Sequence, residues 1–298
     1  MPELLSRQEI QQLLPQRPRE GHKGTFGHLF VLAGSRRFSG AVKLTCDGAM
    51  RSGVGLTTAG VPAPLADTLA AAFVEPMLLP LPVTDSGSIA CEAADIVTDF
   101  AADKSAMVVG PGLSQDPSTM RLARRLALER ALPLLLDADG LNAFAAQRTR
   151  LALRDAATTA DAVFTPHPGE MARLTGMTTK EIQQNRAAAA TKYAPLWRAT
   201  VVLKGAATII AAPDGRIRQN PTGNPGMATG GAGDVLSGVI GALLAQGLEA
   251  FDAACIGVYV HGLAGDIAAR EKSERGLIAR DIIEALPGAW RAIEDAKP

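Results

Sequence analysis

The chain has 298 residues, of which 47% are hydrophobic and 20% are charged, and its thirty basic and thirty acidic residues leave no net charge. Such a composition predicts a globular protein with a sizeable core rather than a disordered chain. The balanced charge argues against a protein that binds nucleic acid or an anionic membrane through a broad electrostatic field.

Three cysteines, Cys46, Cys91 and Cys255, lie far apart and lack CxxC spacing. We therefore expect no disulfide framework and no zinc site, and a reducing, cytoplasmic location. The start of the chain has neither the pattern of a secretion signal nor an apolar run long enough to cross a bilayer.

In chain order, residues 1–22 contain a short polar helix, "SRQEIQQLL", and a connector rich in Pro and Arg. We expect this segment to precede the core, and we expect residues 23–298 to form one domain. From about residue 28 to residue 210, short apolar runs alternate with helical patterns, which is typical of βαβ units and a parallel sheet covered on both faces. The expected strands are "HLFVLAG", "AMVVGPG", "PLLLDADG", "DAVFTPHPG" and "TVVLKGAATIIAAP".

The expected helices between the strands are "SGAVKLTCDGAMRSG", "PSTMRLARRLALERA" and "KEIQQNRAAAATKYAPLW", and the last third of the chain is mostly helical. In an open parallel sheet, ligands bind beyond the carboxyl ends of the strands. Small and polar residues follow five of the predicted strands, so we expect a binding crevice at that edge. These residues fall in the ranges 34–35, 110–114, 137–142, 165–170 and 204–208.

The stretch from Gly223 to Gly233 contains five glycines and runs into an apolar helical pattern, with Asp234 at the junction. A helix that begins near Gly233 exposes unpaired N–H groups and the positive end of its dipole, and glycines allow a phosphate to approach them closely. This pattern predicts an anion hole. Asp234 is either a general base for a hydroxyl that attacks phosphate or a helix cap.

No P-loop, dinucleotide-binding GxGxxG, GxSxG or HExxH motif accounts for the chain. Instead, "TGGAGD" resembles the anion-hole and base motif of the ribokinase-like superfamily. Together with "GPGLS", "LLLDADGLNAF", "TPHPGEMARLTG" and "VVLKGAATII", it resembles the ADP-dependent (S)-NAD(P)H-hydrate dehydratases from about Lys23 to Leu286. The resemblance implies a three-layer α/β/α domain with a mainly parallel central sheet.

The resemblance also implies a reaction and its residues. ADP phosphorylates the 6-hydroxyl of (6S)-NADHX or NADPHX, and elimination of phosphate restores NADH or NADPH, with Mg²⁺ accompanying the nucleotide. Asp234 matches the family's catalytic base. The implied nucleotide contacts are Lys204, Gly205, Ala206, Ala207, Thr208, Gly230, Gly231 and Gly233. The implied substrate contacts are Ala41, Gly112, His167 and Asp234.

Each of these residues also has an ordinary structural interpretation. Lys204 suits a lysine that lies along the sheet edge, Gly112 suits a tight turn, and His167 suits a hydrogen-bonding loop residue. Asp137, Asp139, Asn142 and Glu170 are weaker candidates for the site, and His261 is expected to be a satisfied core histidine. No compact carboxylate cluster identifies ligands for Mg²⁺.

Two other functions fit the same motif: a ribokinase-like vitamin or sugar kinase, and a nucleotide-sensing protein that does not catalyse a reaction. We expect a homo-oligomer, such as a tetramer, that binds neither nucleic acid nor a membrane. The family is often fused to an N-terminal epimerase, for which this chain has no room before Lys23. The NAD(P)H-hydrate epimerase is therefore expected to be a separate partner in the pathway.

Overall fold

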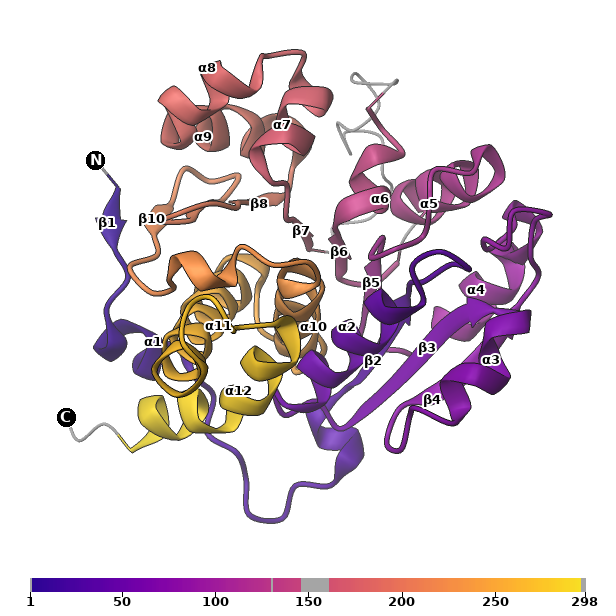
Figure 1. Ribbon diagram of the computed structural model, residues 1–298, viewed down its shortest axis with the longest axis horizontal. Coiled ribbons are helices and arrows are strands. Elements are labelled where there is room, and N and C mark those ends of the chain that lie inside the picture. The colour runs from indigo at the N-terminus through magenta and orange to yellow at the C-terminus, as the bar shows by residue number, and fades with distance from the viewer. Residues whose placement is uncertain (1, 130, 146–160, 296–298) are drawn as a thin grey trace.

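The computed structural model describes residues 2–129, 131–145 and 161–295. Within these residues, ten strands form one sheet. They are β1 (Glu3–Leu4), β2 (His28–Leu32), β3 (Leu56–Pro62), β4 (Met77–Leu81), β5 (Ala106–Val109), β6 (Leu134–Leu136), β7 (Ala162–Phe164), β8 (Thr200–Leu203), β9 (Ile209–Ala211) and β10 (Ile217–Gln219). Their order across the sheet is β1-β10-β9-β8-β7-β6-β5-β2-β3-β4 (Figure 1).

The sheet is mainly parallel, as the sequence predicts. Strands β2 to β8 run in one direction, and β9 runs antiparallel to both of its neighbours, β8 and β10. The connections on either side of β9 are short turns, over residues 204–208 and 212–216. Such short connections can join only antiparallel strands, whereas the parallel strands are joined by longer crossovers.

Helices cover both faces of the sheet and complete the three layers (Figure 1). One face carries α1 (Arg7–Leu13), α2 (Ser39–Met50), α3 (Ala63–Ala70), α10 (Ala232–Ala245), α11 (Ala250–Lys272) and α12 (Ala279–Glu294). The other face carries α4 (Ala94–Ala101), α5 (Pro117–Glu129), α6 (Ala138–Asn142), α7 (Pro168–Thr175), α8 (Thr179–Gln184) and α9 (Arg186–Trp197). In β2, Leu29 and Val31 pack on the first face, and Phe30 and Leu32 pack on the second.

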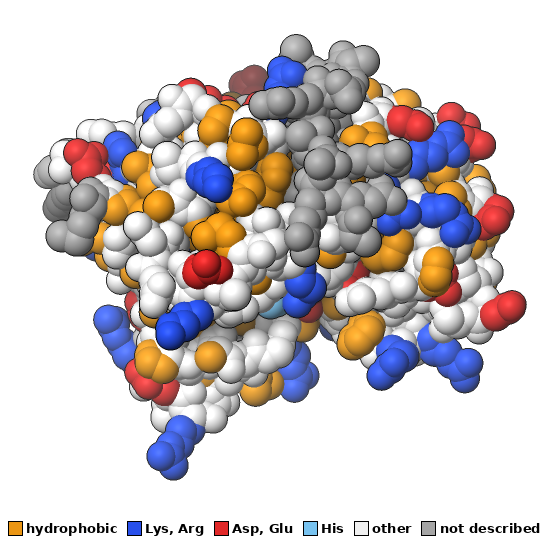
Figure 2. Space-filling view, turned by 90° about the horizontal axis from the view of Figure 1, so that it is seen from above, with side chains coloured by type: hydrophobic (Ala, Val, Ile, Leu, Met, Phe, Trp, Pro, Cys, Tyr) orange, Lys and Arg blue, Asp and Glu red, His pale blue; other side chains and the backbone are white. Residues whose placement is uncertain are grey.

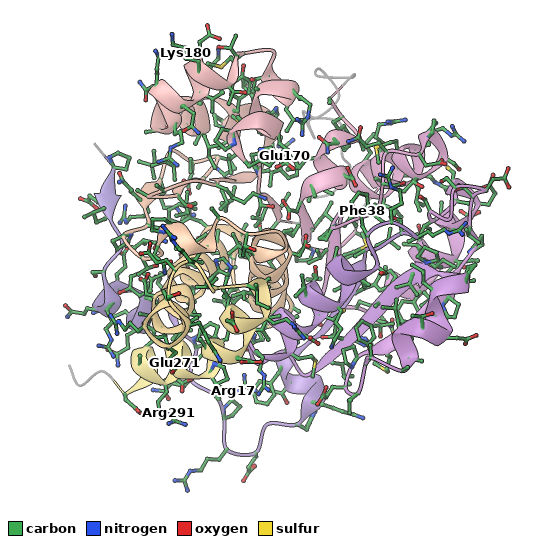
Figure 3. The ribbon with its side chains drawn as sticks, viewed as in Figure 1. Arg17, Phe38, Glu170, Lys180, Glu271 and Arg291 are labelled. Atoms are coloured by element: carbon green, nitrogen blue, oxygen red, sulfur yellow. The ribbon has the colours of Figure 1, made fainter. Side chains whose placement is uncertain are left out.

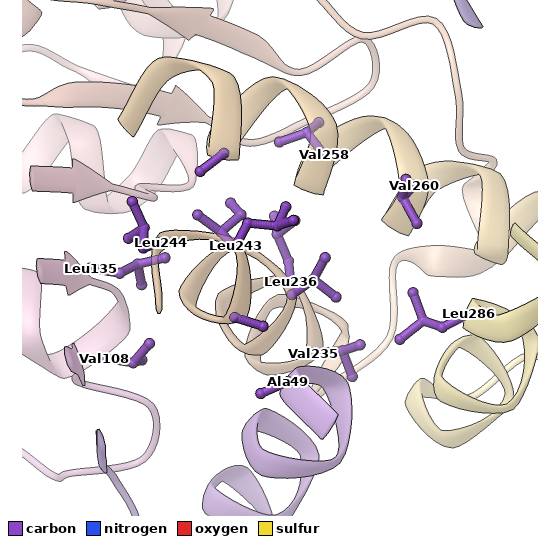
Figure 4. Packing of buried hydrophobic residues seen from close by; sticks show 14 of the residues in the cluster. Ala49, Val108, Leu135, Val235, Leu236, Leu243, Leu244, Val258, Val260 and Leu286 are labelled. Carbon is purple, nitrogen blue, oxygen red and sulfur yellow. The ribbon is translucent and has the colours of Figure 1, made fainter. Parts of the chain in front are cut away.

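Helix α10 lies at the centre of the first core, between the strands and the helices α2 and α11 (Figure 4). Close packing needs small residues here, because a Cβ at Gly238 would lie 2.0 Å from the carbonyl oxygen of Thr45 on α2. A Cβ at Gly241 would lie 2.5 Å from Cγ2 of Val108 on β5. Contacts on both sides therefore fix α10, whose first turn carries Asp234.

The N-terminal segment belongs to the domain, so the expectation that it precedes the core is wrong for residues 3–13. Strand β1 pairs in parallel with β10 at the sheet edge. Ile10 on α1 is fully buried in the first core, and Leu5 is 2% exposed. The helix looks polar in the sequence because only one narrow face of it is buried.

The segment predicted as one helix from Lys180 forms two, α8 and α9, which are separated at Asn185. Asn185 is not helical (φ −149°, ψ 69°), and its side chain accepts a hydrogen bond from the N–H of Ala188 at the start of α9. Asparagine is a favoured N-cap for this reason.

None of the helices in the described ranges combines the length and the apolar content needed to cross a bilayer. On the face shown in Figure 2, basic and acidic side chains are interspersed rather than gathered into a field of one sign.

Candidate active site

The polar segments that follow the strands meet at one edge of the sheet, as the crevice hypothesis requires. The N–H of Gly34, after β2, donates to the carbonyl of Pro111, after β5, over 2.8 Å. Gly110 packs so closely against the segment after β6 that a Cβ on it would lie 1.8 Å from the carbonyl oxygen of Asp137. The N–H of Lys204, after β8, donates to the carbonyl of Pro166, after β7, over 2.9 Å.

The glycine-rich loop ends at the start of α10 and leaves backbone donors free. Gly231 is the N-cap and has a φ of 92°, a left-handed conformation that favours glycine. The N–H groups of Gly233 and Asp234 have no hydrogen-bond acceptor among the described residues. A Cβ at Gly230 would have no atom within 4 Å. The loop therefore offers open, unpaired donors to an anion, as the sequence predicts.

A lysine and two carboxylates lie beside this helix start. Nζ of Lys204 donates to Oδ1 of Asp137 over 2.7 Å and lies 3.9 Å from Oε2 of Glu170. The hydroxyl of Ser237 donates to Oδ2 of Asp137 over 2.8 Å. A Cβ at Gly233 would lie 3.5 Å from Nζ of Lys204, which places the ammonium next to the anion hole. The lysine is thus held by a buried ion pair and is not the water-directed lysine of the alternative interpretation.

Electrostatics distinguish Asp234 from an ordinary helix cap. Its carboxylate accepts no hydrogen bond from any described residue, and the N-cap position belongs to Gly231. Burial, followed by the charge of Asp137, raises the pKa of Asp234 to about 7 against the opposing effect of Lys204. A helix N-terminus normally stabilises a carboxylate by about 0.3 to 1 kcal/mol, so burial and like charges outweigh the dipole here. A pKa near neutrality suits a general base.

The pKa values of Lys204 and Glu170 are both raised in this site. Burial opposes the charge on Lys204, but the carboxylates of Asp137 and Glu170 outweigh that effect and raise its pKa. Burial also raises the pKa of Glu170, against the opposing effect of Lys204. Lys204 therefore stays charged beside the anion hole.

The predicted substrate residues Ala41 and Gly112 lie next to each other. Gly112 has a φ of 62°, and a Cβ on it would lie 2.8 Å from Cβ of Ala41 and 2.8 Å from Cβ of Phe38. The turn that contains Gly112 is also held by the hydroxyl of Ser35, which donates to its carbonyl over 2.8 Å. Gly112 therefore adopts a tight turn and also packs its backbone closely against Ala41 and Phe38.

His167 is the N-cap of α7 and forms a capping box with Glu170. Its Nδ1 accepts hydrogen bonds from the N–H groups of Gly169 (3.0 Å) and Glu170 (3.3 Å). Its own N–H donates to Oε2 of Glu170 over 2.8 Å. Burial lowers the pKa of His167, and the positive charges of Lys204 and Arg173 lower it further. The imidazole is half exposed and neutral at physiological pH.

The predicted nucleotide segment, residues 204–208, is the turn between β8 and β9. Gly205 has a φ of 147° and Ala207 a φ of 54°, so the turn exposes its backbone in an unusual conformation. Arg186 holds it from the second helical layer, because its guanidinium donates to the carbonyls of Ala206 and Ala207. The hydroxyl of Thr208 closes the turn by donating to the carbonyl of Gly205 over 3.0 Å.

Two residues at this edge, Ser237 and Phe38, were not predicted from the sequence. Ser237 lies one turn after Asp234 on α10, and this spacing was the signal that could have identified it. Phe38, at the start of α2, is 48% exposed beside Ala41 and gave no signal in the sequence. Glu170 and Phe38 come from helical layers on opposite faces of the sheet (Figure 3).

His261 on α11 differs from the expectation of a satisfied core histidine. It is 8% exposed, but its Nε2 has no hydrogen-bond partner among the described residues. Burial lowers the pKa of His261 to about 4, so the ring remains neutral. The apolar helix pattern predicted its burial correctly, and the ring is satisfied only in part, because it has a backbone hydrogen bond with Ala232 but none at Nε2.

A cavity of about 490 Å³ lies away from these residues. Its lining includes Gly27, Ser105, Pro133 and Asp161, which precede β2, β5, β6 and β7. It therefore opens at the amino ends of the parallel strands, opposite the edge that carries Asp234. It is not part of the candidate site.

Comparison with known proteins agrees with the arrangement at the carboxyl edge. The sequence pattern of the NAD(P)H-hydrate dehydratase family matches residues 29–288. The chain is 44% identical over 282 residues to the bifunctional NAD(P)H-hydrate repair enzyme Nnr of Moorella thermoacetica, covering 95% of this chain and 52% of that enzyme. It thus spans about half the length of that relative.

Two further relatives match along most of their length. The ADP-dependent (S)-NAD(P)H-hydrate dehydratase of Neisseria meningitidis is 40% identical over 276 residues, which cover 90% of this chain and 86% of the relative. The structure of the ADP/ATP-dependent NAD(P)H-hydrate dehydratase from Bacillus subtilis, co-crystallized with ATP and Mg²⁺, superposes with a TM-score of 0.84 at 32% identity and covers 98% of this chain and 99% of that one. The chain therefore belongs to the NAD(P)H-hydrate dehydratase family, with a ribokinase-like fold.

Proposed function

We propose that the protein is an ADP-dependent dehydratase that converts (6S)-NADHX and NADPHX into NADH and NADPH. The β-phosphoryl group of ADP moves to the 6-hydroxyl of the hydrate, and AMP leaves. Loss of the phosphate from C6 and of a proton from the adjacent C5 then restores the ring double bond. Hydroxide is a poor leaving group at neutral pH and phosphate is a better one, so the transfer activates the elimination.

One observation carries this proposal: Asp234 lies next to unpaired helix N–H groups, its carboxylate is free of hydrogen bonds to described residues, and its pKa is about 7. Such a carboxylate is able to take the proton of the 6-hydroxyl as that oxygen attacks phosphorus. In this proposal the N–H groups of Gly233 and Asp234 donate hydrogen bonds to the transferred phosphoryl group, and Gly230 and Gly231 shape the hole. Phosphoryl transfer requires positioning and charge stabilisation of this kind.

Lys204 supplies the positive charge for the nucleotide phosphates, supported by the ion pair with Asp137. The remaining turn residues, Gly205 to Thr208, provide backbone contacts to the nucleotide. Ala41, Gly112 and His167 line the side that receives the hydrate. These assignments rest on the shared edge of the sheet and on the family membership of the chain.

Magnesium would accompany the nucleotide. Within the described ranges, no three His, Cys, Asp or Glu side chains are grouped closely enough to hold a metal ion. That arrangement fits Mg²⁺ bound mainly through substrate phosphates and water, as is usual for this ion, and not a dedicated protein cage. When bound, the ion would neutralise phosphate charge, and we assign no protein ligand to it.

The decisive experiment is NADH formation, followed at the absorption band of the dihydronicotinamide, from enzymatically prepared (6S)-NADHX with Mg²⁺ and either ADP or ATP. We expect one phosphate per NADH formed. Asp234→Asn should lower kcat by about 10²- to 10⁴-fold, as for loss of a general base, while ADP still binds. Full activity of this variant would refute the role of Asp234.

The same assay separates the two other functions. A vitamin or sugar kinase, which the ribokinase-like fold permits, would accumulate a stable phosphoester and release no phosphate. A non-catalytic nucleotide sensor would be stabilised against heat by ADP without turnover.

We propose further that the enzyme acts in the cytoplasm, that it assembles as a homo-oligomer such as a tetramer, and that a NAD(P)H-hydrate epimerase supplies the S epimer. The three cysteines are unpaired, which is in keeping with a reducing compartment. Size-exclusion chromatography with light scattering tests the assembly.

A further inference from the structure

Arg173 lies beside His167 at the mouth of the site. It belongs to the segment "TPHPGEMARLTG" but was not among the site residues predicted from the sequence. His167 is the N-cap of α7, and Gly169 and Arg173 lie four positions apart on this helix and share a face. A Cβ at Gly169, which follows the cap, would lie 3.9 Å from Nη1 of Arg173. The charge of Arg173 is also close enough to lower the pKa of His167.

A chain of hydrogen bonds holds the Arg173 side chain in place. Its Nε donates to Oδ1 of Asn142 over 3.1 Å, and Nδ2 of Asn142 donates to Oδ1 of Asp139 over 3.1 Å. Oδ2 of Asp139 accepts from the N–H of Ser114 over 2.9 Å. The chain thus connects α7 to α6 and to the loop after β5. Ordering a long side chain on ligand binding costs conformational entropy. Because the guanidinium of Arg173 is already held in place, ligand binding loses less of this entropy.

The outer nitrogens of this guanidinium are unused. Nη1 and Nη2 of Arg173 have no hydrogen-bond acceptor among the described residues, and the side chain is exposed. Their four N–H bonds form a planar fork that matches the oxygens of a phosphate.

His167 adds a donor, because its hydrogen bonds fix where its proton lies. Nδ1 accepts from the N–H groups of Gly169 and Glu170, so the neutral ring carries its proton on Nε2. A proton on Nδ1 would instead face the N–H groups of Gly169 and Glu170, so that three donors would point at one another. His167 therefore offers an N–H to a ligand and has no free lone pair with which to act as a base.

The charges around these donors favour an anion at this point. Oε1 of Glu170 lies 3.4 Å from Nε2 of His167, but Oε2 of the same carboxyl lies 3.9 Å from Nζ of Lys204, whose positive charge balances it. Lys204, the other nearby cation, is already paired with Asp137.

We propose that Arg173, oriented by Asn142, together with Nε2–H of His167 binds the diphosphate bridge of the dinucleotide substrate. The inference rests on the proposed dehydratase function and extends it, since it places the bridge over α7 and the reduced ring toward Asp234. Arg173 and His167 contact the substrate, and Asn142 is a positioning residue.

Calorimetric titration with NADH, which carries the same bridge and undergoes no turnover, tests the subsite. We expect Arg173→Gln to weaken NADH binding about 10- to 100-fold, as for a lost charge-assisted hydrogen bond. Arg173→Lys should recover part of the loss and make binding more sensitive to salt. His167→Asn keeps an N-cap acceptor but removes the Nε2 donor, and should weaken binding about 3- to 10-fold.

Asn142 and a distant arginine supply the matched variants. Asn142→Ala removes the oxygen that accepts from Arg173 and should weaken NADH binding less than Arg173→Gln does, because the guanidinium itself remains. Arg291→Gln, on α12 and far from Glu170 in Figure 3, should leave binding unchanged. In turnover, Arg173→Gln should raise KM for both hydrates equally, with kcat within about twofold, and should leave the Kd of ADP unchanged.

Three results would overturn the proposal. In the first, Arg173→Gln binds NADH within twofold of wild type. In the second, the variant loses affinity only for NADPH and NADPHX, which would assign the cation to the 2′-phosphate. In the third, the variant binds ADP more weakly but binds NADH normally. Failure of the dehydratase function is a separate result. In that case wild-type protein would bind NADH in a way that depends on Arg173 and yet would not convert (6S)-NADHX.

Discussion

Replacing Asp234 with asparagine should make the folded protein more stable at neutral and alkaline pH. The pKa of this group is about 7 in the folded protein against 3.8 for an unperturbed aspartate, with burial as the main cause. The difference is about three pKa units, and each unit corresponds to about 1.36 kcal/mol, so ionisation opposes folding by up to about 4 kcal/mol. Asparagine removes that cost. The measured gain should be smaller, because the new amide needs hydrogen-bond partners of its own.

The sign of the pH dependence follows from the raised pKa. Stability associated with the neutral form of Asp234 is fully present below pH 3.8 and is lost as the pH rises through about 7. The stability difference between Asp234→Asn and wild type should therefore grow between pH 4 and pH 7 and level off above pH 8. Urea denaturation at five pH values across this range, with the same m-value for both proteins, measures the difference.

Asp67→Asn, at an exposed position on α3, controls for the removal of a surface carboxylate. A difference between Asp234→Asn and wild type that does not change with pH would refute the reasoning. So would a variant that is less stable than wild type at pH 8. Either result would show that the carboxylate is solvated or paired in the folded protein.

In the proposed reaction the base must be ionised, so kcat/KM should rise with pH through an apparent pKa near 7, as a pH–rate profile would show. Lys204→Met should leave the buried Asp137 without its cation, lower the unfolding free energy by about 3 to 5 kcal/mol in urea titrations and abolish ADP-dependent turnover. Gly238→Ala should clash with the carbonyl of Thr45, cost about 1 to 3 kcal/mol and lower Tm by scanning calorimetry, and an unchanged Tm would contradict the close packing of α10.

The sequence predicted strands β2 and β5 to β8. It missed the interior strand β3 and the strands β1, β4 and β10 near the margins of the sheet. Strands β5 to β8 are buried on both faces, so each is a continuous apolar run that stands out between helices. Strand β4 is an edge strand that is only partly buried, and its apolar run contains Pro80, which argues against a strand inside a sheet. Strand β1 has two residues, and its pairing with β10 depends on a contact more than 200 positions away. Local patterns do not report such contacts.

The candidate site shows the same division. Gly231 and Asp234 could be predicted because helix starts and glycine loops leave a local signature. The partner of Lys204 could not be chosen from the sequence, because Asp137 and Lys204 meet only through the order of strands β6, β7 and β8. Arg173 was missed because its task depends on Asn142, which lies on another helix.

The raised pKa of Asp234 resolves a conflict inherent in placing an acid beside an anion hole. A permanently ionised carboxylate would repel the incoming phosphoryl group at the start of α10. A group with a pKa of about 7 is ionised in a sizeable fraction of molecules at neutral pH, so the base is available without strong activation. When Asp234 takes the hydroxyl proton it becomes neutral. The repulsion between its carboxylate and the phosphoryl group therefore falls during the transfer step. Burial and the nearby Asp137 therefore contribute to the proposed catalysis through the same interactions that oppose folding at high pH.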